Sequence, residues 1–171
     1  MKKWLVLLGV SVFFQYLPAQ TNTPLQPAYL RFPTVPPFNI LKVDSATWLT
    51  RDDLRKNHRT LIMFFSPECE HCKHQTEDIL AASGQFKDIE IVMATYQPFS
   101  EMKEFYQYYR IADHPNIKMG RDEKYFFGPF YNIHNLPFLG LYDKKGNLIT
   151  TFEGNQKVST IMKAFSSKDK E

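Results

Sequence analysis

The sequence contains only two cysteines, Cys69 and Cys72, among its 171 residues. Structural disulfides in exported proteins usually join distant segments, and a bridge across two intervening residues would close almost no loop. A stabilising crosslink is therefore a poor explanation for this pair. Reversible thiol chemistry is a better one.

Long hydrophobic runs are also missing. The most apolar stretch, residues 4–14, is shorter than the roughly 20 residues that a membrane-spanning helix needs. It follows Lys2 and Lys3 and precedes Ala19, which is the order of charged, apolar and small residues in secretory signal peptides. We therefore expect residues 1–19 to be a signal peptide and the protein to act in the periplasm or on the extracytoplasmic side of a membrane. If uncleaved, this segment would be its membrane contact.

The chain has little net charge, +3 at pH 7 from 21 Lys and Arg against 18 Asp and Glu. Loss of residues 1–19 would remove two lysines and lower it to +1. Basic residues are mixed with acidic ones and form no long run, so the pattern of a nucleic-acid-binding protein is excluded. We expect a mixed, solvated surface and no nucleic-acid partner.

The 43% of hydrophobic residues suits one ordinary globular domain. Five prolines fall between residues 20 and 37, which predicts an extended lead-in or tether that does not pack. Residues 38–167 are expected to form the single domain, without internal repeats.

Hydrophobic patterning within residues 38–167 predicts an α/β fold. The continuous apolar run at 60–65 is typical of a strand buried on both faces, and strand, helix and strand across 60–94 imply parallel pairing with a right-handed crossover. The expected strands are 38–43, 47–49, 60–65, 88–94, 116–119, 138–142 and 148–152. The expected helices are 50–53, 69–82, 100–111, 122–131 and 158–165.

The two cysteines stand where the buried strand has ended and the next helix begins. A helix N-terminus presents unpaired N–H groups and the positive end of the helix dipole, which stabilise a thiolate at Cys69. A thiolate is the nucleophile of disulfide exchange, and the short spacing lets Cys72 reach back to the mixed disulfide. The sequence therefore predicts that Cys69 attacks and Cys72 resolves.

Glu70 and His71, between the cysteines, are expected to tune the Cys69 thiol in opposite senses. A nearby carboxylate disfavours the thiolate, whereas a protonated imidazole favours it. These two residues leave the direction of the redox reaction open.

Residues 38–165 resemble the thioredoxin superfamily, and especially the exported TlpA/ResA-type thiol–disulfide oxidoreductases. The resemblance is carried by the lead-in hairpin, the strand 61–65, the segment Ser66-Pro67-Glu68-Cys69-Glu70-His71-Cys72 and the segment 131–139. It implies a thioredoxin fold whose central mixed sheet is flanked by helices and extended by an N-terminal β-hairpin. It also implies protein thiols and disulfides as substrates, a redox partner that recharges the dithiol, and no cofactor or metal.

Within the segment 131–139, the resemblance assigns two further site residues. Pro137 is expected to follow a cis peptide bond and to lie against the cysteines, while Leu136 offers backbone groups to a bound peptide. Cis X-Pro bonds are uncommon, so this is a specific expectation.

The sequence departs from the pattern of thioredoxins proper. Glu68 stands where they have Trp, and Met63 stands where they carry a buried acid. Glu77 is the nearest helical acid that could serve Cys72 instead, although a solvated surface acid is the simpler interpretation. The reductive direction is favoured over oxidation or isomerisation.

Two other functions are compatible with the residues. A copper-binding or copper-delivery module would use Cys69, Cys72 and His134, and resembles the Sco family, which spaces its cysteines four apart rather than three. A peroxiredoxin-like peroxidase would need Thr three residues before its reactive cysteine, where this chain has Ser66. A pure binding module would not need both cysteines.

Overall fold

A computed structural model of the chain describes residues 26–167. The expected signal peptide, residues 1–19, lies outside this range. The strands are β1 Asn39–Lys42, β2 Trp48–Thr50, β3 Arg59–Phe64, β4 Ile89–Thr95, β5 Ile117–Arg121, β6 Phe138–Tyr142 and β7 Leu148–Glu153. The α-helices are α1 Ala28–Arg31, α2 Glu70–Ala81, α3 Ser83–Phe86, α4 Phe99–Tyr108, α5 Phe127–Tyr131 and α6 Val158–Ser167, and two short 3₁₀ turns are η1 Arg51–Asp53 and η2 Ile111–Asp113.

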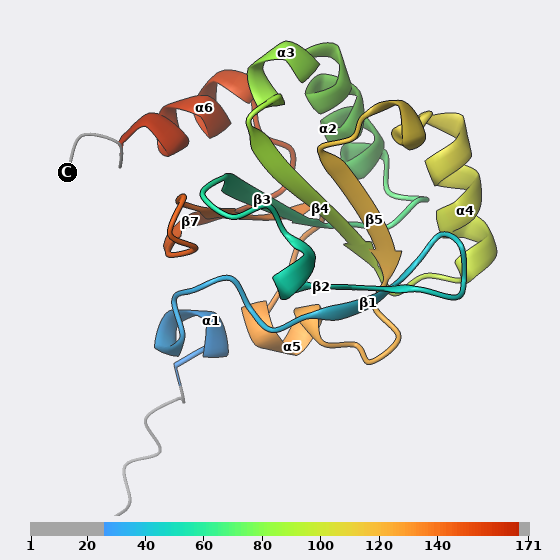
Figure 1. Cartoon of the computed structure of the whole chain (residues 1–171), viewed down its shortest axis with the longest axis horizontal. Helices are drawn as coiled ribbons and strands as arrows, with labels where there is room; N and C mark the ends of the chain where they lie inside the picture. Colours follow the sequence, from blue (N-terminus) through green and yellow to red (C-terminus); the bar gives the residue numbers. More distant parts are fainter. Residues whose placement is uncertain (1–25, 168–171) are drawn as a thin grey trace, which may run out of the picture.

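The seven strands form one mixed sheet in the order β2-β1-β5-β4-β3-β6-β7 (Figure 1). β3, β4 and β5 are parallel neighbours, whereas β6 pairs antiparallel with β3. The unit β3–α2–β4 is the predicted parallel crossover. The β1–β2 hairpin extends the sheet because β1 pairs antiparallel with β5, so the expected N-terminal hairpin is confirmed.

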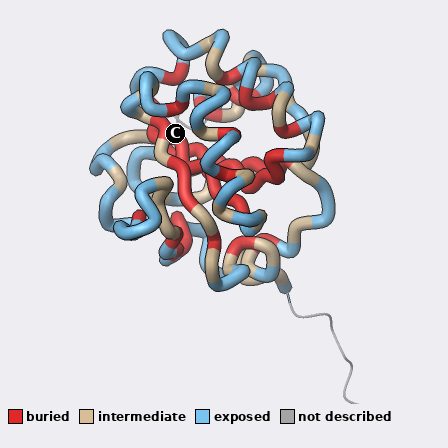
Figure 2. Tube along the Cα trace, turned by 90° about the vertical axis from the view of Figure 1, so that its right-hand side faces the viewer, coloured by how far each residue is buried: buried red, intermediate tan, exposed pale blue. Residues whose placement is uncertain are grey.

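Two cores cover the two faces of the sheet, as the alternation of side chains along a strand requires. Leu61 and Met63 of β3 face α2, α4 and α6, whereas Ile62 and Phe64 face α1 and α5. Every residue of β4 is buried, and Figure 2 shows the buried residues running through the middle of the molecule. The continuous apolar runs were therefore correct indicators of doubly covered strands.

Close contact between β1 and β5 depends on Gly120. A Cβ atom added there would lie 2.8 Å from Ile40 Cγ1 and 2.9 Å from the Leu41 carbonyl oxygen. Both distances are shorter than real Cβ contacts, so a side chain at this position would push the hairpin away from the sheet.

The lead-in differs from its prediction. Residues 28–31 form the helical turn α1, Val35 is only 6% exposed, and Thr34 pairs with Asn147. Tyr29 and Val35 belong to the core on the α5 face, and burying them stabilises the segment against the domain. The expectation of an unpacked tether is therefore wrong for residues 26–37.

The helix expected at 122–131 begins only at Phe127. The Asp122 carboxylate accepts a 2.9 Å hydrogen bond from the Phe127 backbone N–H, and Tyr125 has a left-handed backbone with φ of 52°. A left-handed residue cannot continue a right-handed helix, so residues 122–126 form a loop.

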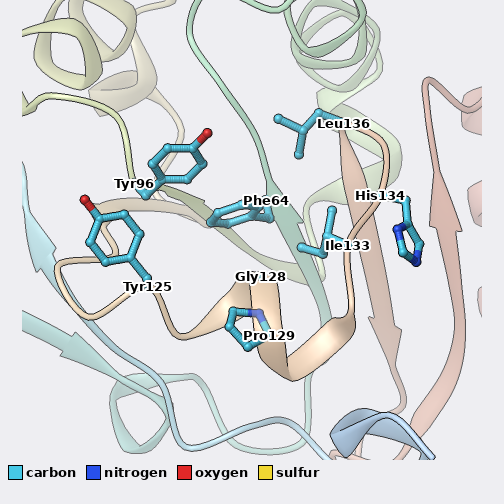
Figure 3. A pocket seen from close by; sticks show the side chains of 8 residues that line it. All are labelled: Phe64, Tyr96, Tyr125, Gly128, Pro129, Ile133, His134 and Leu136. Carbon is cyan, nitrogen blue, oxygen red and sulfur yellow. The ribbon is translucent and has the colours of Figure 1, made fainter. Parts of the chain in front are cut away.

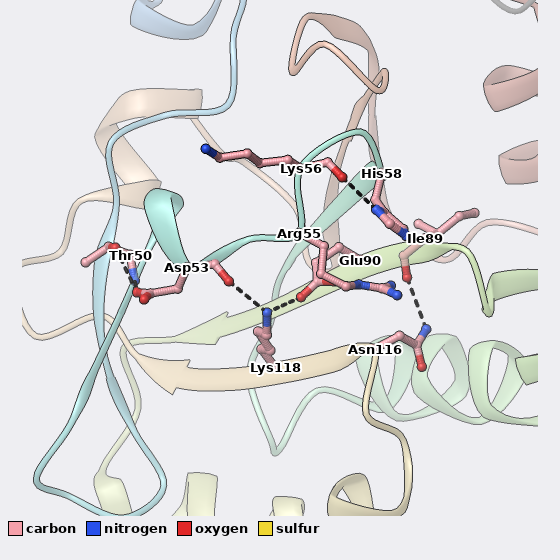
Figure 4. Close-up of polar contacts among 9 residues, drawn as sticks. All are labelled: Thr50, Asp53, Arg55, Lys56, His58, Ile89, Glu90, Asn116 and Lys118. Carbon is pink, nitrogen blue, oxygen red and sulfur yellow. Dashed lines mark hydrogen bonds and ion pairs between the residues drawn. The ribbon is translucent and has the colours of Figure 1, made fainter.

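A buried ion cluster closes the end of the sheet opposite the cysteines. Glu90, fully buried near the start of β4, forms ion pairs with Arg55 and Lys118 (Figure 4). Lys118 also donates a 3.0 Å hydrogen bond to the Asp53 carbonyl. A buried carboxylate needs such partners because desolvation would otherwise oppose its charge.

Among residues 26–167, no helix has the length and hydrophobicity needed to cross a bilayer.

Candidate active site

Cys69 occupies the N-cap position of α2 and is partly exposed. Its backbone N–H donates to the Ser66 carbonyl at 3.1 Å, and its own carbonyl accepts from Cys72 and Lys73, both at 3.0 Å. Helix formation thus starts at Cys69, after Pro67 has interrupted the chain that leaves β3. This places the first thiol at the positive end of the helix dipole, as predicted.

Cys72 lies one helical turn later and is fully buried in the core beneath α2. Burial, together with interaction with the Cys69 thiol, raises the pKa of Cys72 well above its usual range. Neither cysteine is in a disulfide. The structure therefore separates an accessible thiol from an inaccessible one that stays protonated at neutral pH.

The Leu136 backbone, which precedes Pro137, lies next to Cys69. The Leu136–Pro137 peptide bond is cis, as the resemblance implies, and Pro137 is buried. The Cys69 Sγ atom lies 3.9 Å from the Leu136 carbonyl oxygen, across 67 residues of sequence. The predicted cysteines and the predicted proline loop are thus brought together.

Glu153 is a site residue that the sequence analysis missed. Its carboxylate accepts hydrogen bonds from the backbone N–H groups of His134, at 3.1 Å, and Asn135, at 3.0 Å, and from the Asn135 side chain at 2.9 Å. Partial burial opposes the carboxylate charge, but these bonds prevail and lower the pKa of Glu153. The carboxylate thus holds the two residues that precede Leu136. Its position opposite Phe138 in the β6–β7 ladder becomes evident only once the hairpin register is known.

Gln75 is the second residue that the sequence analysis missed. It is fully buried, donates to the Gln156 carbonyl at 3.2 Å, and accepts from the Gln156 backbone N–H at 2.7 Å. This reciprocal pair ties α2 to the segment leading into α6. A glutamine on the buried side of α2, one turn after Cys72, was the available signal.

The residues between and after the cysteines point outward. Glu70 forms an ion pair with Lys73, Nζ to Oε1 at 2.6 Å, and this hydrogen bond lowers the pKa of Glu70. His71 is exposed. Glu77 accepts a 3.3 Å hydrogen bond from the Tyr109 hydroxyl and pairs with His74. Glu77 is therefore a surface acid and does not reach the buried thiol.

A pocket of about 310 Å³ lies beside the proline loop, on the α5 face of the sheet (Figure 3). Its lining is mostly apolar and aromatic, and Leu136 is one of its walls. The lining residues are Phe64, Tyr96, Tyr125, Gly128, Pro129, Ile133, His134 and Leu136.

The copper alternative finds no ligand set in the part of the chain that the structure describes. No three His, Cys, Asp or Glu side chains gather there in an arrangement that could hold a metal ion. His134 is exposed, and its Nε2 atom lies 3.0 Å from the Asn132 side-chain amide.

No protein-family model matches the chain, and no curated protein matches it. Solved structures do match. A secreted disulfide oxidoreductase of Mycobacterium tuberculosis, described as homologous to E. coli DsbE, has a TM-score of 0.63 at 14% identity, over 77% of this chain and 96% of that one. StoA from Bacillus subtilis has a TM-score of 0.58 at 17% identity, over 77% and 98%. The exposed lipoprotein thioredoxin Etrx1 of Streptococcus pneumoniae has a TM-score of 0.62 at 18% identity, over 76% and 98%.

At such low identities these matches show that the folds are similar. The mixed sheet and the crossover through α2, which the cysteines begin, are consistent with that similarity. The chain has the thioredoxin fold, with an N-terminal β-hairpin extension, as its sequence led us to expect.

Proposed function

We propose that the protein is a thiol–disulfide oxidoreductase that acts on protein substrates outside the cytoplasm. The observation that carries the proposal is the pairing of an accessible Cys69 at the start of α2 with a buried Cys72 one turn later. Disulfide exchange requires this arrangement, because one thiol must be accessible to attack the client disulfide and the other must resolve the mixed disulfide afterwards.

The reaction proceeds by two exchanges. The Cys69 thiolate attacks one sulfur of a client disulfide, which forms a mixed disulfide and releases the other client sulfur as a thiolate. Cys72 then loses its proton and attacks the Cys69 sulfur, which forms the Cys69–Cys72 disulfide and releases the second client thiolate. Both client sulfurs are reduced and both protein thiols are oxidised, so an external dithiol must reduce the protein again.

Leu136 and Pro137 are proposed to bind the client backbone. The Leu136 carbonyl oxygen lies 3.9 Å from Cys69 Sγ, so a peptide whose sulfur meets Cys69 must pass over this loop. Glu153 serves as a positioning residue because it holds the two residues before Leu136.

Disulfide reduction is the proposed direction, in keeping with the resemblance to TlpA/ResA-type proteins. Titrating the Cys69–Cys72 couple against glutathione tests it. A potential of about −270 mV is expected for a reductant, whereas a value of about −120 mV would identify an oxidant.

Two serine variants test the assignment of roles. Cys69→Ser should abolish the reduction of insulin disulfides, whereas Cys72→Ser should form mixed disulfides with client proteins that it cannot release. Thr47→Ser and Ala46→Ser, at exposed positions far from the dithiol, are the matched controls. They show whether introducing a serine in itself affects folding or the assay. Full activity in Cys69→Ser, or a complete lack of trapped adducts in Cys72→Ser, would contradict the proposal.

Export is proposed from the charged, apolar and small residues at the start of the chain. Mass spectrometry of the protein recovered from its native cells should give a mature chain that begins at Gln20. An intact Met1 in a cytoplasmic fraction would contradict this.

A further inference from the structure

The pocket beside the dithiol is lined by two of the exposed aromatic side chains of the described residues. Tyr96 is 38% exposed and Tyr125 is 60% exposed, and both line the pocket. They come from loops 29 residues apart that follow β4 and β5. Exposed aromatic groups that converge on one hollow are typical of a recognition site rather than of ordinary surface.

The interior of the pocket is apolar. In Figure 3 the side chains of Ile133 and Leu136 point toward the Phe64 ring, and the two tyrosine rings lie on the other side of Phe64. The rings form a continuous row, with centroids 5.9 Å apart between Phe64 and Tyr96 and 5.8 Å apart between Tyr96 and Tyr125. Such a surface favours a hydrophobic or aromatic group and offers no fixed charge to an ion.

The loop that carries Tyr125 is fixed before any ligand binds. Asp122 is 1% exposed, its backbone N–H donates to the Thr95 carbonyl at 2.7 Å, and its carboxylate accepts from the Phe127 N–H at 2.9 Å. These bonds hold Tyr125 in its left-handed backbone conformation, which is uncommon for an aromatic residue. A preformed pocket loses less conformational entropy on binding than a flexible one does.

Leu136 connects the pocket to the reacting sulfur. Its carbonyl oxygen lies 3.9 Å from Cys69 Sγ, and its side chain is a wall of the pocket. A client cysteine bonded to Cys69 therefore has its neighbouring residues next to the row of aromatic rings. The volume of about 310 Å³ has room for a large side chain.

We propose that this pocket, with Tyr96 and Tyr125 as its specificity-determining residues, binds an apolar or aromatic side chain next to the reactive cysteine of the client. The inference rests on the proposed disulfide exchange and names the substrates that it favours. Those clients carry Phe, Leu or a similar residue beside the cysteine that meets Cys69.

The test compares two symmetric peptide disulfides, built from Gly-Phe-Cys-Phe-Gly and from Gly-Ser-Cys-Ser-Gly, as oxidants of the reduced protein. Phe on both sides of the cysteine makes the result independent of peptide direction. The second-order rate constant should be about tenfold higher for the Phe peptide, because one aromatic side chain is buried on binding. Acid quenching and chromatography measure both constants, and glutathione disulfide serves as a small oxidant that does not fill the pocket.

Variants assign any preference to the pocket. Tyr125→Asn should reduce the ratio of the two peptide rate constants toward one, and it should fold because Asn tolerates a left-handed backbone. Tyr125→Phe keeps the ring and should retain the full ratio, and Trp48→Ser, which removes an exposed aromatic group on the remote β2 strand, should do the same.

The outcomes are distinguishable. Equal rate constants for the two peptides in the unmodified protein would overturn the pocket proposal, and so would a ratio that survives Tyr125→Asn. A Tyr125-dependent dimer without any peptide preference would show that the pocket receives a second copy of the chain instead. No reaction with either peptide or with glutathione disulfide would contradict the proposed function itself.

Discussion

At the scale of single residues, the main contrast is between two thiols of the same chemical type. Cys69 is partly exposed at the N-cap of α2, whereas Cys72 has no exposed surface and a raised pKa. The two cysteines lie within one helical turn but differ in burial. Their reactivity should therefore differ, because alkylating agents and disulfides react with accessible thiolates.

This contrast predicts selective alkylation. In the reduced protein at pH 7, iodoacetamide should modify Cys69 faster than Cys72 by about two orders of magnitude or more, since the Cys72 thiol is buried and protonated. Peptide mapping by mass spectrometry over a time course measures both rates. The same time course in urea, where both thiols are exposed, is the control. Equal rates in the folded protein, as in urea, would contradict the burial of Cys72.

At the scale of elements, the site is held by contacts between segments that are distant in sequence. Glu153 at the end of β7 fixes the residues that precede the cis peptide bond, and Gln75 in α2 bonds to Gln156 before α6. Gly120 in β5 lets the β1–β2 hairpin close on the sheet. Each contact links two elements that local sequence alone does not connect.

Glu153 predicts a pH dependence of stability. Its folded pKa lies below the ordinary glutamate value of 4.5, so its hydrogen bonds stabilise the fold above that pH and are lost as pH falls through the folded pKa. Glu153→Gln should lower the free energy of unfolding at pH 7 by about 1 kcal/mol, a modest amount because solvent screens the partly exposed carboxylate. Below pH 4.5 the free energy of unfolding should fall less steeply in the variant than in the unmodified protein. Urea unfolding from pH 3 to 7 tests this, and an unchanged acid limb in the variant would contradict it.

Gly120 predicts a steric effect on the hairpin. Gly120→Ala would bring a methyl group to 2.8 Å from Ile40 Cγ1 and should destabilise the fold by about 1–3 kcal/mol. Gly84→Ala is the matched control, because a Cβ there meets nothing within 4 Å. Hydrogen exchange of the β1 amides should rise in Gly120→Ala alone, and equal stability of the two variants would refute this role.

At the scale of the whole molecule, stabilising charge and reacting sulfur occupy opposite ends of the parallel strands. Glu90 pairs in register with Thr60 near the start of β3, whereas Cys69 follows the far end of that strand. The ion cluster at Glu90 therefore supports the fold without entering the site.

This separation predicts that stability and activity respond differently to one mutation. Glu90→Ala leaves Arg55 and Lys118 without their carboxylate and should cost about 3–5 kcal/mol, while the rate constant with glutathione disulfide in the folded protein stays unchanged. Asp52→Asn, which alters an exposed pair with Arg51, is the control and should change stability by less than about 1 kcal/mol. A matching loss of activity in folded Glu90→Ala would argue against the separation.

The features that could be predicted from the sequence are those that depend on a local pattern of residues. Apolar runs located the central strands, and the spacing of Cys69 and Cys72 after a broken strand located the start of α2. The packing of the lead-in was not predictable in this way, because proline content does not show that Val35 finds a core to enter. The loop at 122–126 was likewise missed, since aromatic residues suit a helix until Asp122 bonds to the Phe127 N–H.

The rest of the site was hidden for a similar reason. Glu153 and Gln75 look like ordinary polar residues until the hairpin register and the packing of α2 bring their partners to them. Tyr96 and Tyr125 form one wall only because β4 and β5 are adjacent and parallel. Tertiary contact creates these arrangements, and a single sequence does not display it.

The place of Trp48 has an optical consequence. It is the only tryptophan among residues 26–167, it is 42% exposed, and it lies in β2 at the edge of the sheet. Four strand spacings, roughly 19 Å, separate it from β3, beyond which the dithiol begins. Tryptophan emission should therefore change when the hairpin unfolds. It should change very little when the cysteines are oxidised or reduced, so redox titrations of this protein need a chemical or mass-based signal.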